Sequence, residues 1–256
     1  MQQPSHVLIT GASSGIGAAL ARNYATRGIR LSLGGRDLQR LQGVAAECRA
    51  RGATVTTAAL DVTDRAGMRA WVHAEDDAAP LDLVIANAGM VAGTRASEET
   101  EERAREVLAV NLDGVLNTAC PAIERMRPRR RGQVALMSSL AGYRGFPDAP
   151  AYSASKTAVR ALAEAWRGAL RAEGIQVSAI CPGFVTTPMT AGNDFRMPFL
   201  MNAERAAEIV VHGLARDRGR ISFPWPMTLG VWFISALPAR WSDRLLRPRP
   251  EKPRQA

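Results

Sequence analysis

Residues 6–17, which read HVLITGASSGIG, decide the fold of this chain. A short apolar run typical of a buried strand leads directly into a glycine-rich turn, and a helical pattern follows from residue 15. Glycines permit a tight turn and a close approach of the backbone to a ligand, while the first N–H groups of a helix attract negative charge. The stretch therefore predicts a strand–turn–helix unit that binds a pyrophosphate.

The same strand–helix alternation continues through most of the chain. It predicts one α/β domain with a doubly wound, seven-stranded parallel sheet and helices on both faces. Predicted strands are His6–Thr10, Arg30–Gly34, Ala53–Leu60, Leu83–Ala86, Gln133–Ser138, Gln176–Ile180 and Arg220–Phe223. Helical patterns lie at 15–28, 37–51, 64–78, 98–126, 151–173 and 203–215, with Gly28, Gly52 and Gly174 as helix-ending residues.

Composition narrows the class of protein. The 256 residues are 46% hydrophobic, which is enough for one large core. The three cysteines are too far apart for a metal site, so we expect no metal, reduced core thiols and a cytoplasmic location. No signal peptide and no membrane span is expected. The net charge of +9 is spread along helical patterns without a nucleic-acid-binding motif, so no nucleic-acid partner is expected.

The end of the second predicted strand reads Gly34-Gly35-Arg36. NAD sites tend to carry an acid here for the ribose hydroxyls, whereas NADP sites avoid it and supply arginine for the 2′-phosphate. Gly35 stands at the expected acidic position and Arg36 follows it, while Asp37 is interpreted as the N-cap of the next helix. The pattern favours NADP over NAD.

Tyr152 and Lys156 stand four residues apart in a helical pattern, so they share one helix face. A phenol needs a nearby positive charge to exchange a proton at neutral pH, and Lys156 supplies one. Only Lys156 and Lys252 are lysines among 33 basic residues, so an ammonium group stands here in a chain that otherwise uses arginine.

Six motifs together resemble the short-chain dehydrogenase/reductase family over residues 6–190. They are TGASSGIG at 10–17, Ala86-Asn87-Ala88-Gly89, Asn111, Ser138-Ser139, Tyr152-x-x-x-Lys156 and Pro182-Gly183. Chain length and the TGxxxGxG spacing resemble the short, single-domain branch. The resemblance implies an NADP-dependent oxidoreductase that transfers hydride between nicotinamide and a carbonyl or alcohol substrate. The alternative is an NADP-binding sensor or scaffold with little catalytic activity.

The resemblance also implies residue roles. Tyr152 matches the acid/base, and Lys156 the residue that bonds the nicotinamide ribose and lowers the tyrosine pKa. Ser139, rather than its neighbour Ser138, matches the serine that bonds the substrate oxygen, and Asn111 the residue that holds a water linked to Lys156. Implied cofactor-binding residues are Gly11, Ser13, Ser14, Gly15, Ile16 and Gly17 at the pyrophosphate, Arg36 at the 2′-phosphate, Asp61 and Val62 at the adenine, Asn87, Ala88 and Gly89 on the adenosine side, Pro182, Gly183 and Thr187 at the nicotinamide, and Tyr152 with Lys156. Some of these residues also have a purely structural interpretation. Ser139 and Asn111 could cap a helix or form a turn, Asp61 could end a strand, and Asn87 could connect neighbouring loops.

Two apolar segments leave alternatives open. Met189, Phe195, Met197, Phe199, Leu200 and Met201 form either an apolar substrate loop or loop packing. We expect residues 1–223 to form the catalytic domain and residues 224–256 an apolar and basic extension, packed on the core, at a dimer interface or on an anionic membrane surface. The segment ISFPWPM at 221–227 departs from the family's usual ending, which places a tetramer in doubt and leaves a homodimer as the expectation.

Overall fold

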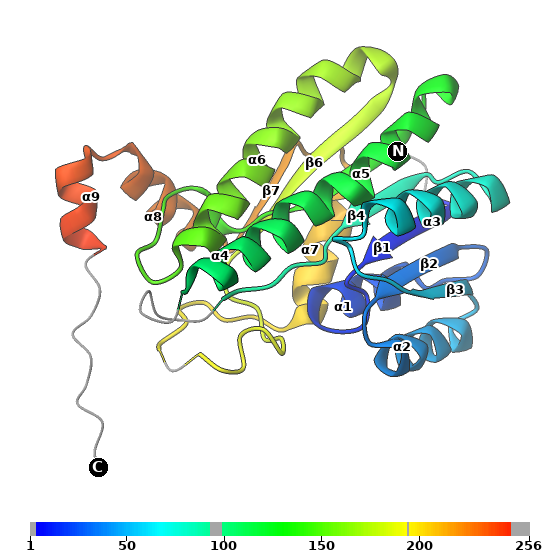
Figure 1. Ribbon diagram of the computed structural model, residues 1–256, viewed down its shortest axis with the longest axis horizontal. Coiled ribbons are helices and arrows are strands. Elements are labelled where there is room, and N and C mark those ends of the chain that lie inside the picture. The colour runs from blue at the N-terminus through cyan, green and yellow to red at the C-terminus, as the bar shows by residue number, and fades with distance from the viewer. Residues whose placement is uncertain (1–3, 93–98, 194, 247–256) are drawn as a thin grey trace.

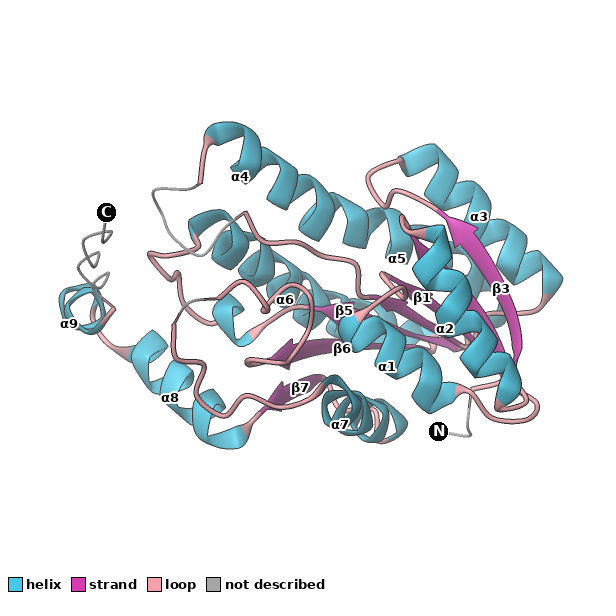
Figure 2. Ribbon diagram, turned by 90° about the horizontal axis from the view of Figure 1, so that it is seen from below, coloured by secondary structure: helices cyan, strands magenta, loops and turns pink. Residues whose placement is uncertain are grey.

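The computed structural model describes residues 4–92, 99–193 and 195–246, and its core is a parallel sheet between two layers of helices (Figures 1 and 2). The sheet order is β3-β2-β1-β4-β5-β6-β7, and all neighbouring strands are parallel. The strands are β1 His6–Thr10, β2 Arg30–Gly35, β3 Thr54–Ala59, β4 Leu83–Ala86, β5 Gly132–Met137, β6 Ile175–Pro182 and β7 Arg220–Phe223. The predicted doubly wound, seven-stranded parallel sheet is confirmed.

Each face of the sheet carries its own helices and its own apolar core. One face is covered by α1 Gly15–Tyr24, α2 Leu38–Ala50 and α7 Ala203–Ala215. The other is covered by α3 Arg65–Ala78, α5 Gly114–Arg129 and α6 Pro150–Leu170, and α4 Glu101–Leu108 lies beside α6. Two short helices, α8 Trp225–Ala236 and α9 Ala239–Leu245, follow β7.

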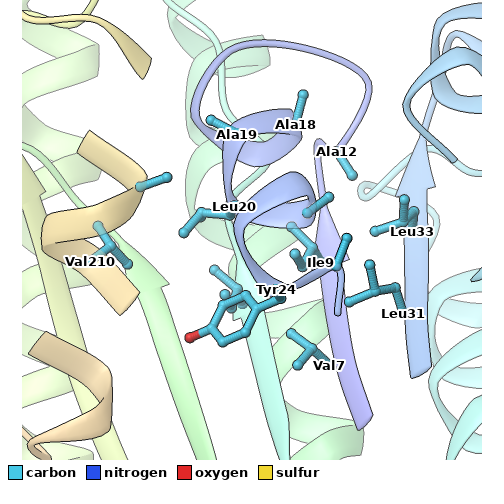
Figure 3. Close-up of a cluster of buried hydrophobic side chains, with 14 of the residues drawn as sticks. Val7, Ile9, Ala12, Ala18, Ala19, Leu20, Tyr24, Leu31, Leu33 and Val210 are labelled. Carbon is cyan, nitrogen blue, oxygen red and sulfur yellow. The ribbon is translucent and has the colours of Figure 1, made fainter. Parts of the chain in front are cut away.

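The first strand shows that the sheet is buried on both faces. Val7 and Ile9 point into the core under α1 (Figure 3). Leu8 belongs to the core on the opposite face. Such a strand reads as a continuous apolar run because water reaches neither face. The small side chains of α1, such as Ala18, let this helix lie close to the sheet (Figure 3). The carboxyl end of β1 and the amino end of α1 are thereby fixed next to each other.

Several predicted boundaries differ from the structure. The helix predicted at 98–126 is α4 and α5 joined by a π-helical turn, Ala109–Asp113, and it continues to Arg129. A π turn places one additional residue in the helix, which no apolar periodicity reveals. The first helix ends at Tyr24, not at Gly28, whereas Gly52 and Gly174 follow helix ends as predicted.

The C-terminal helices contribute little to the core. Val231 is the one buried residue of α8, and Met227 packs partly against the same core. Ile234 is half-buried, whereas six large apolar side chains of α8 and α9 are exposed, so packing on the core accounts for only part of this segment. None of the helices in the described ranges is long and apolar enough to cross a membrane.

The cysteine expectation needs one correction. All three thiols are free, and Cys48 and Cys181 are buried as core residues. Cys120 is exposed, because it lies on the outer side of α5. A helix exposes part of its surface even where its sequence neighbours are apolar, and the sequence pattern alone does not identify that side.

Candidate active site

A cleft of about 400 Å³ runs along the carboxyl ends of the central strands. In a parallel α/β sheet this edge gathers the loops that follow β1, β2, β4, β5 and β6, so residues far apart in sequence meet there. It is lined by Ser139, Tyr152 and Lys156 and by every other residue predicted to bind the cofactor: Gly11, Ser13, Ser14, Gly15, Ile16, Gly17, Arg36, Asp61, Val62, Asn87, Ala88, Gly89, Pro182, Gly183 and Thr187. Asn111 is the one predicted site residue that does not line the cleft, because its side chain is fully buried.

The glycine-rich turn at one side of the cleft is possible only with small residues. Gly11 has φ +65°, and a methyl group there would lie 2.8 Å from the Ala88 Cα. A methyl group at Gly17 would overlap the Gly11 carbonyl oxygen. Ser14 begins α1 without a side-chain cap, whereas α2 and α3 are capped by Asp37 and Asp64. The amino end of α1 therefore presents uncapped N–H groups to the cleft, as a bound phosphate requires.

Asn87 holds this turn against β4. Its Nδ2 donates to the carbonyl oxygens of Thr10 at 2.9 Å and Gly11 at 3.2 Å, and its backbone N–H donates to the Thr10 hydroxyl at 3.1 Å. The alternative in which Asn87 ties neighbouring loops together is thus confirmed. The side chain lines the cleft as well, so both descriptions apply to it.

The loop after β2 forms the opposite end of the cleft. Gly34 lies under the Trp71 ring, which leaves no room for a side chain, whereas a methyl group at Gly35 would meet only ordinary contacts. Asp37 caps α2 by accepting from the Arg40 N–H at 3.0 Å, and its other oxygen lies 3.1 Å from the Arg40 guanidinium. The interpretation of Asp37 as an N-cap is confirmed. Arg36, exposed, has no ion-pair partner among the residues that the structure describes.

Tyr152, Lys156 and Ser139 meet at the other end. Lys156 is only 3% exposed, and its Nζ donates to the Met137 carbonyl oxygen at 2.9 Å. The same Nζ lies 5.6 Å from the centre of the Tyr152 ring, as the spacing on one helix face predicts. Ser139 Oγ accepts from the Ala141 N–H at 3.1 Å and donates to the Pro182 carbonyl oxygen at 3.4 Å. A phenol, an ammonium group and a hydroxyl thus share one wall.

Asn111 stands in the π-helical turn, fully buried. Its Oδ1 accepts from the Met90 N–H at 2.8 Å, and its Nδ2 donates to the Met90 carbonyl oxygen and to the Ser155 hydroxyl, each at 3.0 Å. A methyl group at Gly89 would lie 3.1 Å from this Oδ1 and 3.3 Å from Lys156 Nζ, so both groups border Gly89. Asn111 joins the loop after β4 to α6 beside the lysine.

The chain matches the short chain dehydrogenase family model over residues 5–196. It belongs to the short-chain dehydrogenase family. It is 40% identical over 241 residues to an uncharacterized oxidoreductase of Myxococcus xanthus, with 94% of this chain and 95% of the relative covered. An uncharacterized oxidoreductase of Mycobacterium tuberculosis is 33% identical over 243 residues, with 93% and 96% covered.

Solved structures agree in fold with this short-chain dehydrogenase. A short-chain dehydrogenase/reductase from Burkholderia phymatum, solved in complex with NAD, has a TM-score of 0.82 at 26% identity and covers 98% of each chain. A short-chain dehydrogenase from Sphingobium yanoikuyae, solved with NADPH, has a TM-score of 0.77 at 28% identity, covering 94% of this chain and 91% of the other. The expected family and fold are confirmed, and the chain is an oxidoreductase of that family.

Burial dominates the electrostatics of this dehydrogenase's cleft. It lowers the pKa of Lys156 to about 8, because the ammonium group loses hydration. It raises the pKa of Tyr152, while a hydrogen bond with Ser139 acts in the opposite direction. The expected lowering of the phenol pKa by Lys156 is therefore not found in the chain alone. The lysine is bonded to Met137, and desolvation of the phenol has the larger effect.

Some cleft residues were missed by the sequence interpretation. Arg40 and Asp37 line the cleft near Arg36, and Met137 contributes a backbone carbonyl to Lys156. Backbone groups carry no sequence signal. Arg40 had one available signal, its position on the first turn of the helix that follows Arg36. The remaining missed residues are Leu60, Val110, Val185, Pro188 and Thr190.

Proposed function

We propose that this protein is an NADP(H)-dependent oxidoreductase that transfers hydride between nicotinamide and a carbonyl or alcohol substrate. The observation that carries the proposal is the cluster of Tyr152, Lys156 and Ser139 on one wall of the cleft that begins at the glycine-rich turn. The solved relatives with NAD and with NADPH support a nicotinamide dinucleotide as the cofactor class.

The residues present fit such a cofactor. The uncapped end of α1 and the backbone around Gly11 suit a pyrophosphate, since N–H groups there have no competing side-chain cap. Asp61 and Val62 line the cleft where an adenine would lie. Lys156 is the ribose ligand in this proposal, and Pro182, Gly183 and Thr187 border the nicotinamide. When bound, the reduced nicotinamide supplies hydride to the carbonyl carbon.

Tyr152 is proposed to donate a proton to the substrate oxygen. The raised pKa of the buried phenol keeps the proton in place at neutral pH, so the group is ready to act as an acid. Ser139 would hold the substrate oxygen, because it lines the same end of the cleft as the phenol. Positioned acid–base assistance of this kind contributes about 10²–10⁴ in rate.

Lys156 and Asn111 are proposed to complete the proton transfer. After the phenol gives up its proton, the nearby ammonium group stabilises the resulting phenolate. Asn111 borders Gly89 together with Lys156, which is the place where a water linking the lysine to solvent would be held. In the oxidative direction the same groups act in reverse order.

Selection of NADP over NAD is proposed to rest on the loop after β2. Gly35 has space for a side chain, so the missing acid is not imposed by packing. Arg36 forms no ion pair within the described ranges, although its charge helps to lower the pKa of Asp61, and Arg40 lines the same cleft. A 2′-phosphate there would meet the Arg36 guanidinium, while the Asp37 carboxylate is paired with Arg40.

The test of this selection is a charge placed at Gly35. Gly35→Asp should lower kcat/KM for NADPH at least about tenfold relative to NADH, because a carboxylate repels the 2′-phosphate. Gly35→Asn is the matched control, since it adds nearly the same volume without charge, and it should keep the NADPH preference. Equal effects of Asp and Asn would contradict the electrostatic explanation.

Activity itself is tested with a broad panel of ketones and aldehydes, with NADPH oxidation followed by absorbance. The apolar side chains of the loop after β6 favour apolar carbonyl substrates: Met189 lines the cleft, and Phe199 is exposed nearby in sequence. Tight NADPH binding without oxidation by any member of the panel would support the sensor or scaffold alternative. The expected homodimer is tested separately, by measuring the molar mass of the protein in solution with light scattering.

A further inference from the structure

The exposed apolar side chains of this protein are concentrated near its C-terminus. Twelve large hydrophobic residues are exposed among those the structure describes, and six of them lie on α8 and α9 at 57–72% exposure. We call these six the C-terminal apolar surface: Trp225, Leu229, Trp232, Phe233, Trp241 and Leu245. Six large apolar side chains exposed on two consecutive short helices are uncommon on a protein that faces only water.

The arrangement on α8 is regular. Trp225, Leu229, Trp232 and Phe233 follow the i, i+4, i+7, i+8 pattern of one helix face, whereas Val231 lies on the opposite side and packs against the core. The helix is thus apolar all round, with one side anchored and the other open. In α9, Trp241 and Leu245 repeat the i, i+4 spacing.

The inner side of α8, opposite the C-terminal apolar surface, adjoins the end of the cleft that holds Ser139 and Tyr152. Met227 of α8 reaches within 3.0 Å of the place where a Gly183 Cβ would stand. Helix α8 also contacts β7 and the turn Leu140–Gly142, and both views show α8 and α9 at the end of the molecule where α6 begins (Figures 1 and 2). Four more exposed apolar residues, Met189, Phe195, Phe199 and Leu200, belong to the loop after β6.

The charge of the C-terminal segment indicates which kind of partner the C-terminal apolar surface can bind. Residues 224–256 hold six basic residues (Arg240, Arg244, Arg247, Arg249, Lys252 and Arg254) and two acidic ones (Asp243 and Glu251), which gives +6 − 2 = +4. Of the acids, Asp243 lies 3.3 Å from Arg144, and Arg144 also donates to Ser242 at 2.7 Å, which fixes α9 to the body. Arg240 lies over the Trp241 ring at 5.9 Å.

This combination matches an anionic lipid surface. Tryptophan and arginine side by side are typical of the membrane–water interface, where the ring lies at headgroup depth and the cation meets lipid phosphate. A second copy of the same chain fits less well, because a two-fold contact between C-terminal apolar surfaces would bring Arg240 and Arg244 of both copies together. Since no described helix can span a bilayer, binding would be peripheral.

We propose that the C-terminal apolar surface docks this protein on the face of an anionic bilayer, with the Ser139–Tyr152 end of the cleft beside the lipid. The inference goes beyond the proposed function, because docking requires neither cofactor nor turnover. It is tested with the full chain by flotation on vesicles of phosphatidylcholine alone and of phosphatidylcholine with about 30% phosphatidylglycerol.

The expected result is binding to the anionic vesicles, with a shift of tryptophan emission to shorter wavelength. The double variant Trp232→Glu/Phe233→Glu should lose at least about tenfold in vesicle affinity, because two carboxylates replace the side chains that enter the interface. Leu38→Glu is the matched control, an exposed apolar residue on α2, and it should bind as the original chain does. Arg240→Gln/Arg244→Gln and about 0.5 M salt should each weaken binding.

Three results would overturn the proposal. The first is a chain that does not float with the anionic vesicles. The second is floating that the Trp232→Glu/Phe233→Glu variant retains, with the variant's fold checked by circular dichroism. The third is an original chain that binds no vesicles but self-associates in light scattering, with self-association lost in the Trp232→Glu/Phe233→Glu variant. That result would assign the C-terminal apolar surface to contact with a second copy.

Discussion

Polar groups at the carboxyl ends of the parallel strands, called here the carboxyl edge, differ in their hydrogen bonding from those at the amino ends, the amino edge. At the carboxyl ends of the strands, the buried ammonium group of Lys156 has one backbone carbonyl as its hydrogen-bond partner in the described part of the chain, and α1 begins without a side-chain cap. At the amino edge, polar side chains bond to one another. His6 Nδ1 contacts the Ala79 carbonyl oxygen and Nε2 the Ser32 hydroxyl, each at 2.8 Å, and Ser32 donates to Glu75 at 2.6 Å.

An ion pair continues the amino edge. Arg129 donates to both Asp76 oxygens at 2.9 and 2.7 Å and to the Leu81 carbonyl oxygen at 2.8 Å, and the Leu81 N–H donates to Asp76. These side chains find their partners inside the chain, whereas the Lys156 ammonium group and the amino end of α1 remain available to a ligand. The residues proposed for catalysis thus lie at the carboxyl edge, and a stabilising network lies at the amino edge. Substitutions at the first should lower activity, and substitutions at the second should lower the free energy of unfolding.

The largest expected effect is at the carboxyl edge. Tyr152→Phe should lower kcat by about 10²–10⁴ while NADPH affinity stays nearly unchanged, because only the transferable proton is removed. Tyr143→Phe is the matched control: its hydroxyl contacts Ser222 at 2.8 Å and does not line the cleft, so turnover should persist. Retained turnover in Tyr152→Phe would reject the proton-transfer role.

The corresponding change at the amino edge is Arg129→Met. We expect a loss of about 3 kcal/mol in the free energy of unfolding, because the mostly buried Asp76 carboxylate loses its partner, with NADPH affinity unchanged. Arg69→Met is the control, since Arg69 and Glu124 form an exposed pair whose loss should cost less than about 1 kcal/mol. Denaturant unfolding measures both, and equal losses would refute the contrast.

A smaller effect concerns pH at the carboxyl edge. Because the pKa of Lys156 is about 8, the ammonium fraction of the cofactor-free protein falls above that pH, and kcat/KM for NADPH should fall with it. The folded pKa lies below the unfolded value of 10.5, so between these two pH values the unfolded chain binds more protons and the contribution of Lys156 to stability increases with pH.

Lys156→Arg separates the pH effect from a general loss of activity. Arginine stays protonated, so the variant should lack the decline above pH 8 even if its kcat/KM is lower throughout. An unchanged alkaline decline in this variant would mean that another group titrates.

The smallest effect is expected from His6. Burial lowers its pKa below 6.5, so the unfolded chain takes up a proton first as the pH falls. Stability should therefore decrease as the pH falls through 6.5 toward the carboxyl range. His6→Asn should reduce this dependence in thermal unfolding, whereas His212→Asn, at an exposed position of α7, should keep it. Equal pH dependence in all three proteins would contradict the assignment to His6.

The sequence predicted the parts of this molecule that depend on local pattern. Apolar runs predicted the strands, and the spacing of Tyr152 and Lys156 predicted their shared helix face. The pKa direction of Tyr152 and the exposure of Cys120 depend on how much water each side chain meets, which is a property of the assembled layers. The π-helical turn that holds Asn111 could not be predicted because its additional residue leaves no mark in apolar periodicity.

The placement of the cysteines allows the two cores to be observed separately. Cys48 belongs to the core under α1 and α2, and Cys181 to the core under α5 and α6, while Cys120 is accessible from outside. A maleimide reagent should modify Cys120 first, because burial withholds the other two thiols. The rates at which Cys48 and Cys181 then react would report, layer by layer, how often each face of the sheet opens.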